Sequence, residues 1–257
     1  MSREEFAIGR ASGPSSYTPA MSLVDTLPDA AVVLDVGGWA APAQRADWVL
    51  DVLPYETSNW FYRERGETPP PGRVTRERWV EQDACVLPWP FEDDFFDYVI
   101  CSQTLEDVRD PVAICREMTR VGKAGYIASP GPIVELTRGV ESPLYCGWRH
   151  HRWLLDRDGD GIVFIVKPHH VHSPLWPSVR TPKLWQQGAE SFTFEWNGDF
   201  TAREDVLLGP EFDARLAAII RRDALDDLYG ERAREARVLA WNGYRQLRSL
   251  AGRALRG

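Results

Sequence analysis

Three acidic residues stand where runs of apolar residues end, and such positions can bind hydroxyl groups. Asp35 closes the run VVL and precedes Gly37 and Gly38, Asp51 closes the run WVL, and Asp83 stands in QDA. Carboxylate oxygens accept hydrogen bonds, and glycines let a ligand approach the backbone closely. These residues predict a site for a ligand that carries hydroxyl groups.

The turn after Asp35 has a tryptophan, Trp39, where nucleotide-binding turns often have a third glycine. In dinucleotide sites that glycine opens a helix whose N-terminus binds the diphosphate. Trp39, Pro42 and the short distance to Asp51 leave little room for such a helix. Because a carboxylate at Asp51 suits both hydroxyls of a ribose, the spacing favours a nucleoside without a diphosphate over NAD.

All five histidines lie in two short clusters that flank a predicted hairpin over about 151–167. They are His150, His151, His169, His170 and His172. Two registers are open for the turn in DGDG, one with His150 opposite His169 and one with His151 opposite His170, and either gathers the imidazoles. Such a cluster could supply a general base for a hydroxyl, nitrogen ligands for a divalent metal, or a structural hydrogen-bond cluster.

The elements that must position these residues alternate between strand and helix. Strands are expected at 31–36, 48–52, 78–83, 96–102, 125–129 and 192–196, with helices at about 110–121 and after residue 210. Parallel strands joined by helical crossovers predict an α/β fold. With 257 residues, the chain fits a single domain at 1–257.

The composition excludes several classes of protein. The net charge of −8 argues against nucleic-acid binding, and no segment approaches the roughly 20 apolar residues that span a bilayer. The four cysteines have no CxxC spacing, so we expect reduced thiols. We therefore expect a soluble cytoplasmic protein, with a second copy of the chain as a candidate partner.

Four motifs over about 30–130 resemble those of the class I S-adenosylmethionine-dependent methyltransferases. They are DVGG, VLDV, QDACVLPWPFEDDFFDYVICSQTLEDV and VGKAGYIASP. The resemblance implies a Rossmann-like, mostly parallel sheet, with a cofactor half at 30–130, an acceptor-site insertion and last strands at 131–210, and a helical extension at 211–257. The cofactor-binding residues that it implies are Asp35, Gly37, Gly38, Trp39, Asp51, Asp83, Ala84, Ser102 and Gln103.

The chain departs from this family at the position of a general base. Many relatives have Ser-His-x-x-Glu-His where this chain has SQTLED at 102–107, so neither histidine is present. We expect His150 or His151 to take the proton of the acceptor. If the hairpin forms the last two strands of the sheet, these histidines lie at its far end, and Asp107 is the better candidate.

Two further possibilities stay open. A hard ion such as Mg²⁺, held by carboxylates, could orient the acceptor, although no spacing singles out its ligands. The missing histidines also allow a catalytically inactive, cofactor-binding regulator.

The acceptor is predicted from the sequence GWRHHRW, which resembles methyltransferases of polysaccharide and glycoside biosynthesis. This implies O-methylation of a sugar or small glycoside, an oligosaccharide acceptor included, with other small molecules as the alternative. Trp148, Trp153 and Trp176 could stack on a sugar ring, while Arg149 and Arg152 could bind its hydroxyls.

Overall fold

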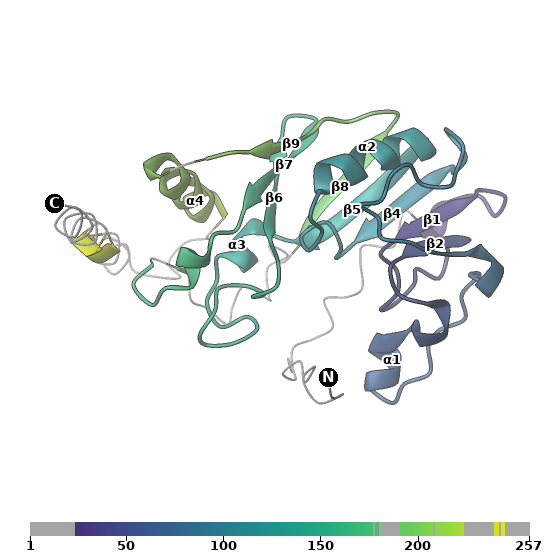
Figure 1. The fold of residues 1–257 in the computed structure, drawn as a ribbon, viewed down its shortest axis with the longest axis horizontal. Coiled ribbons are helices and arrows are strands. Elements are labelled where there is room, and N and C mark those ends of the chain that lie inside the picture. Colours follow the sequence, from purple (N-terminus) through teal and green to yellow (C-terminus); the bar gives the residue numbers. More distant parts are fainter. Residues whose placement is uncertain are drawn as a thin grey trace.

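Two sheets lie side by side in the protein (Figure 1). The structure, a computed structural model, describes residues 24–176, 178–179, 191–207, 209–223, 239–241 and 243–244. Helix α2 (Pro111–Val121) covers one face of the larger sheet, while α3 (Pro132–Glu135) and α4 (Pro210–Asp223) lie beside the smaller one.

The larger sheet has six strands in the order β3-β2-β1-β4-β5-β8. Their bounds are β1 Val33–Val36, β2 Trp48–Asp51, β3 Trp79–Glu81, β4 Tyr98–Ser102, β5 Ala124–Pro130 and β8 Ser191–Asn197. The first five are parallel, and β8 is antiparallel to β5. The predicted fold class is confirmed: this is a Rossmann-like, mostly parallel sheet whose strand order reverses between β1 and β4, where such sheets bind ligands.

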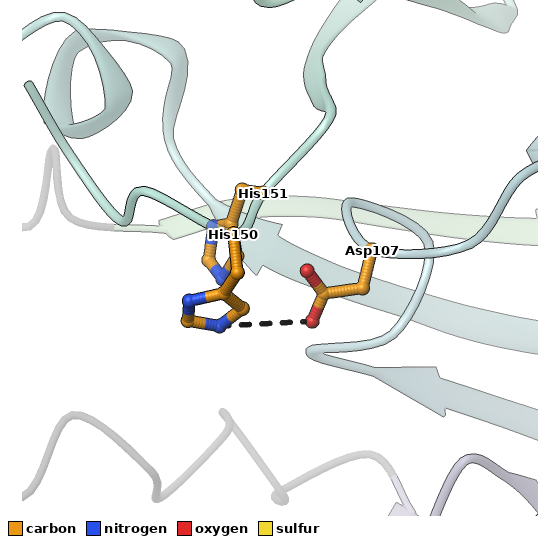
Figure 2. Close-up of side chains that lie close together, drawn as sticks. All are labelled: Asp107, His150 and His151. Atoms are coloured by element: carbon orange, nitrogen blue, oxygen red, sulfur yellow. Dashed lines mark ion pairs between the residues drawn. The ribbon is translucent and has the colours of Figure 1, made fainter. Parts of the chain in front are cut away.

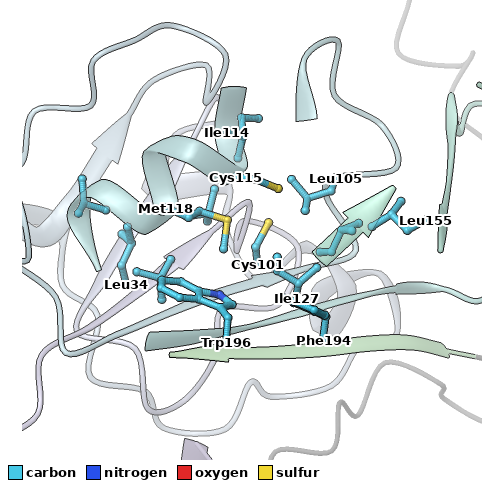
Figure 3. Packing of buried hydrophobic residues seen from close by; sticks show 14 of the residues in the cluster. Leu34, Cys101, Leu105, Ile114, Cys115, Met118, Ile127, Leu155, Phe194 and Trp196 are labelled. Carbon is cyan, nitrogen blue, oxygen red and sulfur yellow. The ribbon is translucent and has the colours of Figure 1, made fainter. Parts of the chain in front are cut away.

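The core forms between α2 and this sheet. Asp110 caps α2 by accepting a hydrogen bond from the amide of Ala113 at 3.0 Å, and Pro111 occupies the first turn, where it displaces no helical hydrogen bond. Figure 3 shows side chains of α2 packed against those of the strands. The cluster includes Leu34, Cys101, Ile114, Cys115, Met118, Ile127, Phe194 and Trp196. All four cysteines are free thiols, as predicted.

The smaller sheet has the order β6-β7-β9. Its strands are β6 Trp153–Asp158, β7 Gly161–Val166 and β9 Ala202–Asp205. The antiparallel pair β6–β7 is the predicted hairpin, and Asp158 pairs with Gly161, which is the register with the two-residue turn at Gly159 and Asp160. A separate sheet was not predicted, because the short, charged strand β9 (ARED) has no apolar pattern.

The other elements are short. They are η1 Val24–Thr26, η2 Tyr55–Thr57, α1 Trp60–Glu64, η3 Arg76–Arg78 and η4 His169–His172. Of the predicted extension at 211–257, α4 is described, whereas most of the residues after it and the N-terminal 23 lie outside the described part. Within the described ranges, no helix combines the length and the apolar character that a membrane span requires.

Asp156 on β6 ties α4 to the smaller sheet. This residue is only 4% exposed, and its carboxylate accepts hydrogen bonds from Arg215 at 3.1 Å and from Arg222 at 3.0 Å. Both arginines belong to α4. A buried carboxylate needs such partners, so the contact fixes where the helix docks.

We expect Asp156→Asn to lower the free energy of unfolding by about 1–3 kcal/mol, because charged hydrogen bonds to a buried oxygen are weakened. Asp158→Asn on the same strand is the matched control. Its ion pair with Arg203 is half exposed, and such pairs contribute about 0–1 kcal/mol. Urea denaturation measures both variants, and equal losses would contradict the assignment of α4 docking to Asp156.

Candidate active site

The carboxyl ends of β1, β2 and β4 meet at one edge of the larger sheet, because β1 lies between the other two and all three are parallel. Gly37 follows β1 with a φ of 80°, and a Cβ there would collide with Thr104. At Gly38 a Cβ would collide with the carboxylate of Asp35. Both positions therefore require glycine, because Thr104 and Asp35 fill the space that a side chain would need, and the two residues form a tight turn, the Gly37–Gly38 cradle.

Two of the predicted carboxylates are buried beside this cradle. Asp35 is 4% exposed and accepts a hydrogen bond from Ala43 at 2.8 Å; burial raises its pKa to about 7. Asp51 accepts hydrogen bonds from the amides of Trp39 at 3.0 Å and Leu53 at 2.8 Å, and burial raises its pKa despite them. The amide of Val52 also donates to this carboxylate and favours its ionised form.

The side chain of Trp39 makes structural contacts within the protein. Its ring stacks on Trp60 with centroids 6.0 Å apart, and its Nε1 donates to Thr57 Oγ1 at 3.0 Å. The tryptophan that replaces a third glycine thus fixes the loop before α1. Among the described residues, no α-helix lies between β1 and β2, as predicted.

Asp83 and Ala84 form the turn after β3. Asp83 Oδ1 accepts a hydrogen bond from the amide of Cys85 at 2.8 Å, and its other oxygen lies 3.5 Å from Arg109. The carbonyl of Ala84 accepts a hydrogen bond from Trp89 Nε1 at 2.9 Å. These contacts hold the turn at the carboxyl end of its strand, beside the strand that ends at Asp51.

Ser102 and Gln103 end β4 next to the glycine turn. Gln103 has a φ of 54°, a left-handed conformation that is costly for a residue with a side chain, and its amide donates to Ala128 at 2.8 Å. The hydroxyl of Thr104 lies 3.1 Å from the carbonyl of Ser102 and 3.4 Å from that of Val36. Strained turns of this kind cluster at functional sites.

The three predicted catalytic residues lie together (Figure 2). A ring nitrogen of His150, one of His151 and a carboxylate oxygen of Asp107 lie within 4.8 Å of one another, and His150 Nε2 is 3.9 Å from Asp107. The amide of Arg152 donates to the carbonyl of Glu106 at 2.7 Å. This bond holds the end of the hairpin that carries the histidines against the loop after β4. His150 and His151 therefore do not lie at the far end of the sheet, which was the alternative that favoured Asp107.

His151 is held by a buried ion cluster that the sequence analysis missed. Its Nδ1 is 2.8 Å from Glu135 Oε1, and Lys167 Nζ donates to Glu135 Oε2 at 2.5 Å and to the carbonyl of Trp148 at 2.7 Å. Burial lowers the pKa of His151, but the hydrogen bond and charge of Glu135 outweigh it, so the pKa is raised. The only signals in the sequence were single charges in the apolar runs PIVEL and GIVFIVK.

His150 is in the opposite electrostatic situation. Burial lowers the pKa of its imidazole, and the nearby carboxylate of Asp107 opposes this shift without cancelling it. The ring lies edge-on to that of His151, with centroids 4.5 Å apart. His150 is therefore the less basic of the two imidazoles, and its ring stands beside the more basic one.

The second histidine cluster does not join the first, so the prediction that either register gathers the imidazoles is wrong. The 3₁₀ helix η4 ends the strand pairing and turns these residues elsewhere. His172 Nδ1 accepts a hydrogen bond from the amide of Cys146 at 3.1 Å, and the ring of His170 stacks on Trp241.

Two of the three predicted sugar-stacking tryptophans are also corrected. Trp153 is 9% exposed and donates its Nε1 to the carbonyl of Val108 at 2.8 Å, while Trp176 is 2% exposed in an apolar cluster. Trp176 therefore cannot face a ligand, and Trp153, although largely buried, lines a pocket with Arg109, Asp110 and Glu204 rather than with the histidines. Trp148 is half-buried with its ring 6.0 Å from that of His151, and Arg152 is exposed.

Only Asp107, His150 and His151 have the spacing of metal ligands among the described residues. Two imidazoles and one carboxylate suit zinc or another transition ion, whereas Mg²⁺ prefers oxygen ligands. The expectation of Mg²⁺ therefore gains no support from this part of the chain.

Comparisons with known proteins find methyltransferases that are similar to part of the chain. Residues 45–128 match a family described as a methyltransferase domain. Solved structures similar to this chain include a putative methyltransferase from Bacillus halodurans (19% identity, 44% of this chain, 50% of that chain, TM-score 0.33). Another is an S-adenosylmethionine-dependent methyltransferase from Aquifex aeolicus (18%, 45%, 65%, 0.32). The alignments thus span between half and two thirds of those chains, and no curated protein matches.

Glu106 is a buried acid next to Asp107 and within the electrostatic influence of His151. It is 1% exposed, and neither carboxylate oxygen has a hydrogen-bond partner among the described residues. Burial raises its pKa to about 8, so the group is protonated at neutral pH. An acid with a raised pKa destabilises the fold as it ionises, so stability should fall as the pH rises from about 4.5 to 8.

We expect Glu106→Gln to remove this slope, which amounts to at most about 1.4 kcal/mol per pH unit. The amide has nearly the shape of the protonated acid and cannot ionise. Urea denaturation at several values of pH tests this, with the exposed Glu92→Gln as the control that keeps the wild-type slope. Parallel pH profiles for wild type and Glu106→Gln would refute the buried neutral acid.

Proposed function

We propose that this chain, which carries a class I methyltransferase fold, uses S-adenosylmethionine to methylate a hydroxyl of a sugar or small glycoside. One observation carries the proposal. Asp107, His150 and His151 gather at the carboxyl side of β4, on the same edge of the sheet as the Gly37–Gly38 cradle. A binding site and a proton acceptor therefore share one edge.

The residues at this edge fit the cofactor. Gly37 and Gly38, in a tight turn, would lie beside its methionine part, and the carboxylate of Asp51 would accept hydrogen bonds from the ribose hydroxyls. Asp83 and Ala84 would bind the adenine, and Ser102 with Gln103 would line the transfer site. When bound, S-adenosylmethionine supplies a methyl group on a positively charged sulfur.

The acceptor hydroxyl must lose a proton, since sugar hydroxyls are poor nucleophiles near neutral pH. The imidazoles beside Asp107 can take that proton. They replace the two histidines that many relatives have after the fourth strand.

The sugar specificity rests on the sequence GWRHHRW and on what stands exposed around it. Trp148 offers a half-buried ring, and Arg149 and Arg152 are exposed donors next to the histidines. The layout of the chain also resembles that of the mycobacterial methylmannose polysaccharide 1-O-methyltransferase. Another small-molecule acceptor is the alternative, and a regulator that binds the cofactor without turnover is the second.

We expect Asp51→Ala to weaken binding of S-adenosylmethionine on the order of 10²-fold or more, because charged hydrogen bonds of about 1.5–3 kcal/mol each are lost. Calorimetry compares this variant with Asp199→Ala, an exposed aspartate beyond β8 that should bind like wild type. Equal affinities would remove Asp51 from the site, and tighter binding of NAD would overturn the cofactor.

An acceptor panel tests the reaction itself. We expect wild-type protein to methylate one or more of a set of mannosides, partially methylated mannosides and other glycosides, with demethylated cofactor released in equal amount. Catechols and small amines complete the panel, and mass spectrometry detects the added methyl group. Turnover of an amine or a catechol without turnover of any glycoside would refute the sugar acceptor, and no turnover with intact cofactor binding would favour the regulator.

A further inference from the structure

We propose that Glu135 is a positioning residue: it fixes the proton of His151 on Nδ1 and so leaves Nε2 free to accept a proton from the acceptor. The inference rests on the proposed function for the identity of the reaction. The position of the ring proton, however, is a property of the protein alone and can be measured without any acceptor.

The geometry assigns one partner to each oxygen of Glu135. Oε1 faces His151 Nδ1 at 2.8 Å, and Oε2 accepts from Lys167 Nζ at 2.5 Å. The side chains of Glu135 and Lys167 are each 1% exposed, so water does not compete for these contacts. A carboxylate can only accept, and a neutral imidazole facing it must therefore carry its proton on Nδ1.

The other ring nitrogen is left unoccupied by the protein. Among the described residues, no group forms a hydrogen bond with His151 Nε2, while its neighbours His150 and Asp107 stand on the open side of the cluster. In the proposed reaction the O–H bond of the acceptor breaks, the proton bonds to Nε2, and the oxygen keeps the electron pair.

Lys167 has a separate task in this arrangement. Its ammonium has three hydrogens and no acceptor, and it binds both Glu135 and the carbonyl of Trp148. Burial raises the pKa of Glu135, but His151 and Lys167 outweigh it, so the pKa is lowered and the group stays ionised. Lys167 thus keeps Glu135 a pure acceptor.

All charged groups that face His151 act on its affinity for a proton. The charged groups are Glu135 from α3, Lys167 after β7 and Asp107 from the loop after β4, and the titratable groups beside them are Glu106, which is protonated at neutral pH, and the adjacent His150. The carboxylates outweigh burial and raise the pKa of His151. Activity should therefore rise with pH through a value above the usual 6.5 of histidine.

The variant Glu135→Gln separates positioning from packing. Because Lys167 can only donate, it will retain the amide oxygen of the new side chain, which turns the amide nitrogen toward His151. Nδ1 must then accept, the ring proton moves to Nε2, and the base is lost. We expect turnover to fall roughly 10²–10⁴-fold with unchanged cofactor affinity, and the rising limb of the pH profile to move to lower pH.

The double variant Glu135→Gln with Lys167→Met provides the sharper test. Without the ammonium, the glutamine is free to present its oxygen to Nδ1, so the original tautomer should return and turnover should recover at least tenfold over Glu135→Gln. In Glu135→Gln the buried ammonium of Lys167 has no negative charge beside it, which destabilises the fold. The double variant removes this ammonium. A role in packing alone predicts that two changes harm more than one.

Nitrogen-15 NMR of labelled histidine reads the tautomer directly at a pH where His151 is neutral, with His151→Ala identifying its signals. We expect the Nδ1–H form in wild type and the double variant, and the Nε2–H form in Glu135→Gln. Asp156→Asn, another buried carboxylate between cations, is the control that keeps the wild-type tautomer. The same tautomer in all variants overturns the positioning role, whereas the expected tautomers without any turnover would leave it standing and contradict only the proposed function.

Discussion

A carboxylate without water must be surrounded by cations and donors, and the buried Glu135 meets this constraint by joining three separate parts of the chain. It belongs to α3 directly after the larger sheet, His151 precedes the first strand of the smaller sheet, and Lys167 follows the second. Removing Lys167 would leave the charge of Glu135 uncompensated in the interior. This buried ion cluster therefore helps to position the two sheets relative to each other, together with apolar packing. The same cluster fixes the position of His151.

The other half of the site depends on strand register. Since β1, β2 and β4 are parallel neighbours, the turn at Gly37, the carboxylate of Asp51 and the end of β4 reach the same edge, where the amide of Trp39 donates to Asp51. The two halves meet at Glu106, whose carbonyl accepts hydrogen bonds from the amides of Arg152 and Trp153. Backbone bonds, which do not depend on side-chain identity, thus set the distance between the binding edge and the histidines.

The parallel strands, the hairpin and the start of α2 could be predicted from the sequence because each has a local cause: an apolar run, a DGDG turn, a proline in the first helical turn. The DGDG turn left two registers open, and only the structure decides between them. The grouping of His150 and His151 with Asp107 was predicted only as alternatives. The burial of Trp153 and Trp176, the separate sheet and the roles of Glu135 and Lys167 depend on contacts between distant segments. In the sequence, Glu135 in PIVEL looks like any charged helix residue. Its role becomes visible only from its contact with Lys167, 32 positions away.

A chain that lacks the usual histidines of a family motif is not inactive for that reason alone. Proton transfer needs an imidazole close to the acceptor, and that imidazole can come from any part of the sequence. In this chain the loop after β4 supplies Asp107 and a neutral Glu106, and the hairpin supplies the rings. In the proposed reaction the base belongs to the insertion and not to the cofactor half. The same insertion carries Trp148 and Arg152, so the groups that would recognise an acceptor and the group that would deprotonate it belong to one segment. A change in this segment can alter the acceptor without disturbing the edge of the sheet where the cofactor would bind.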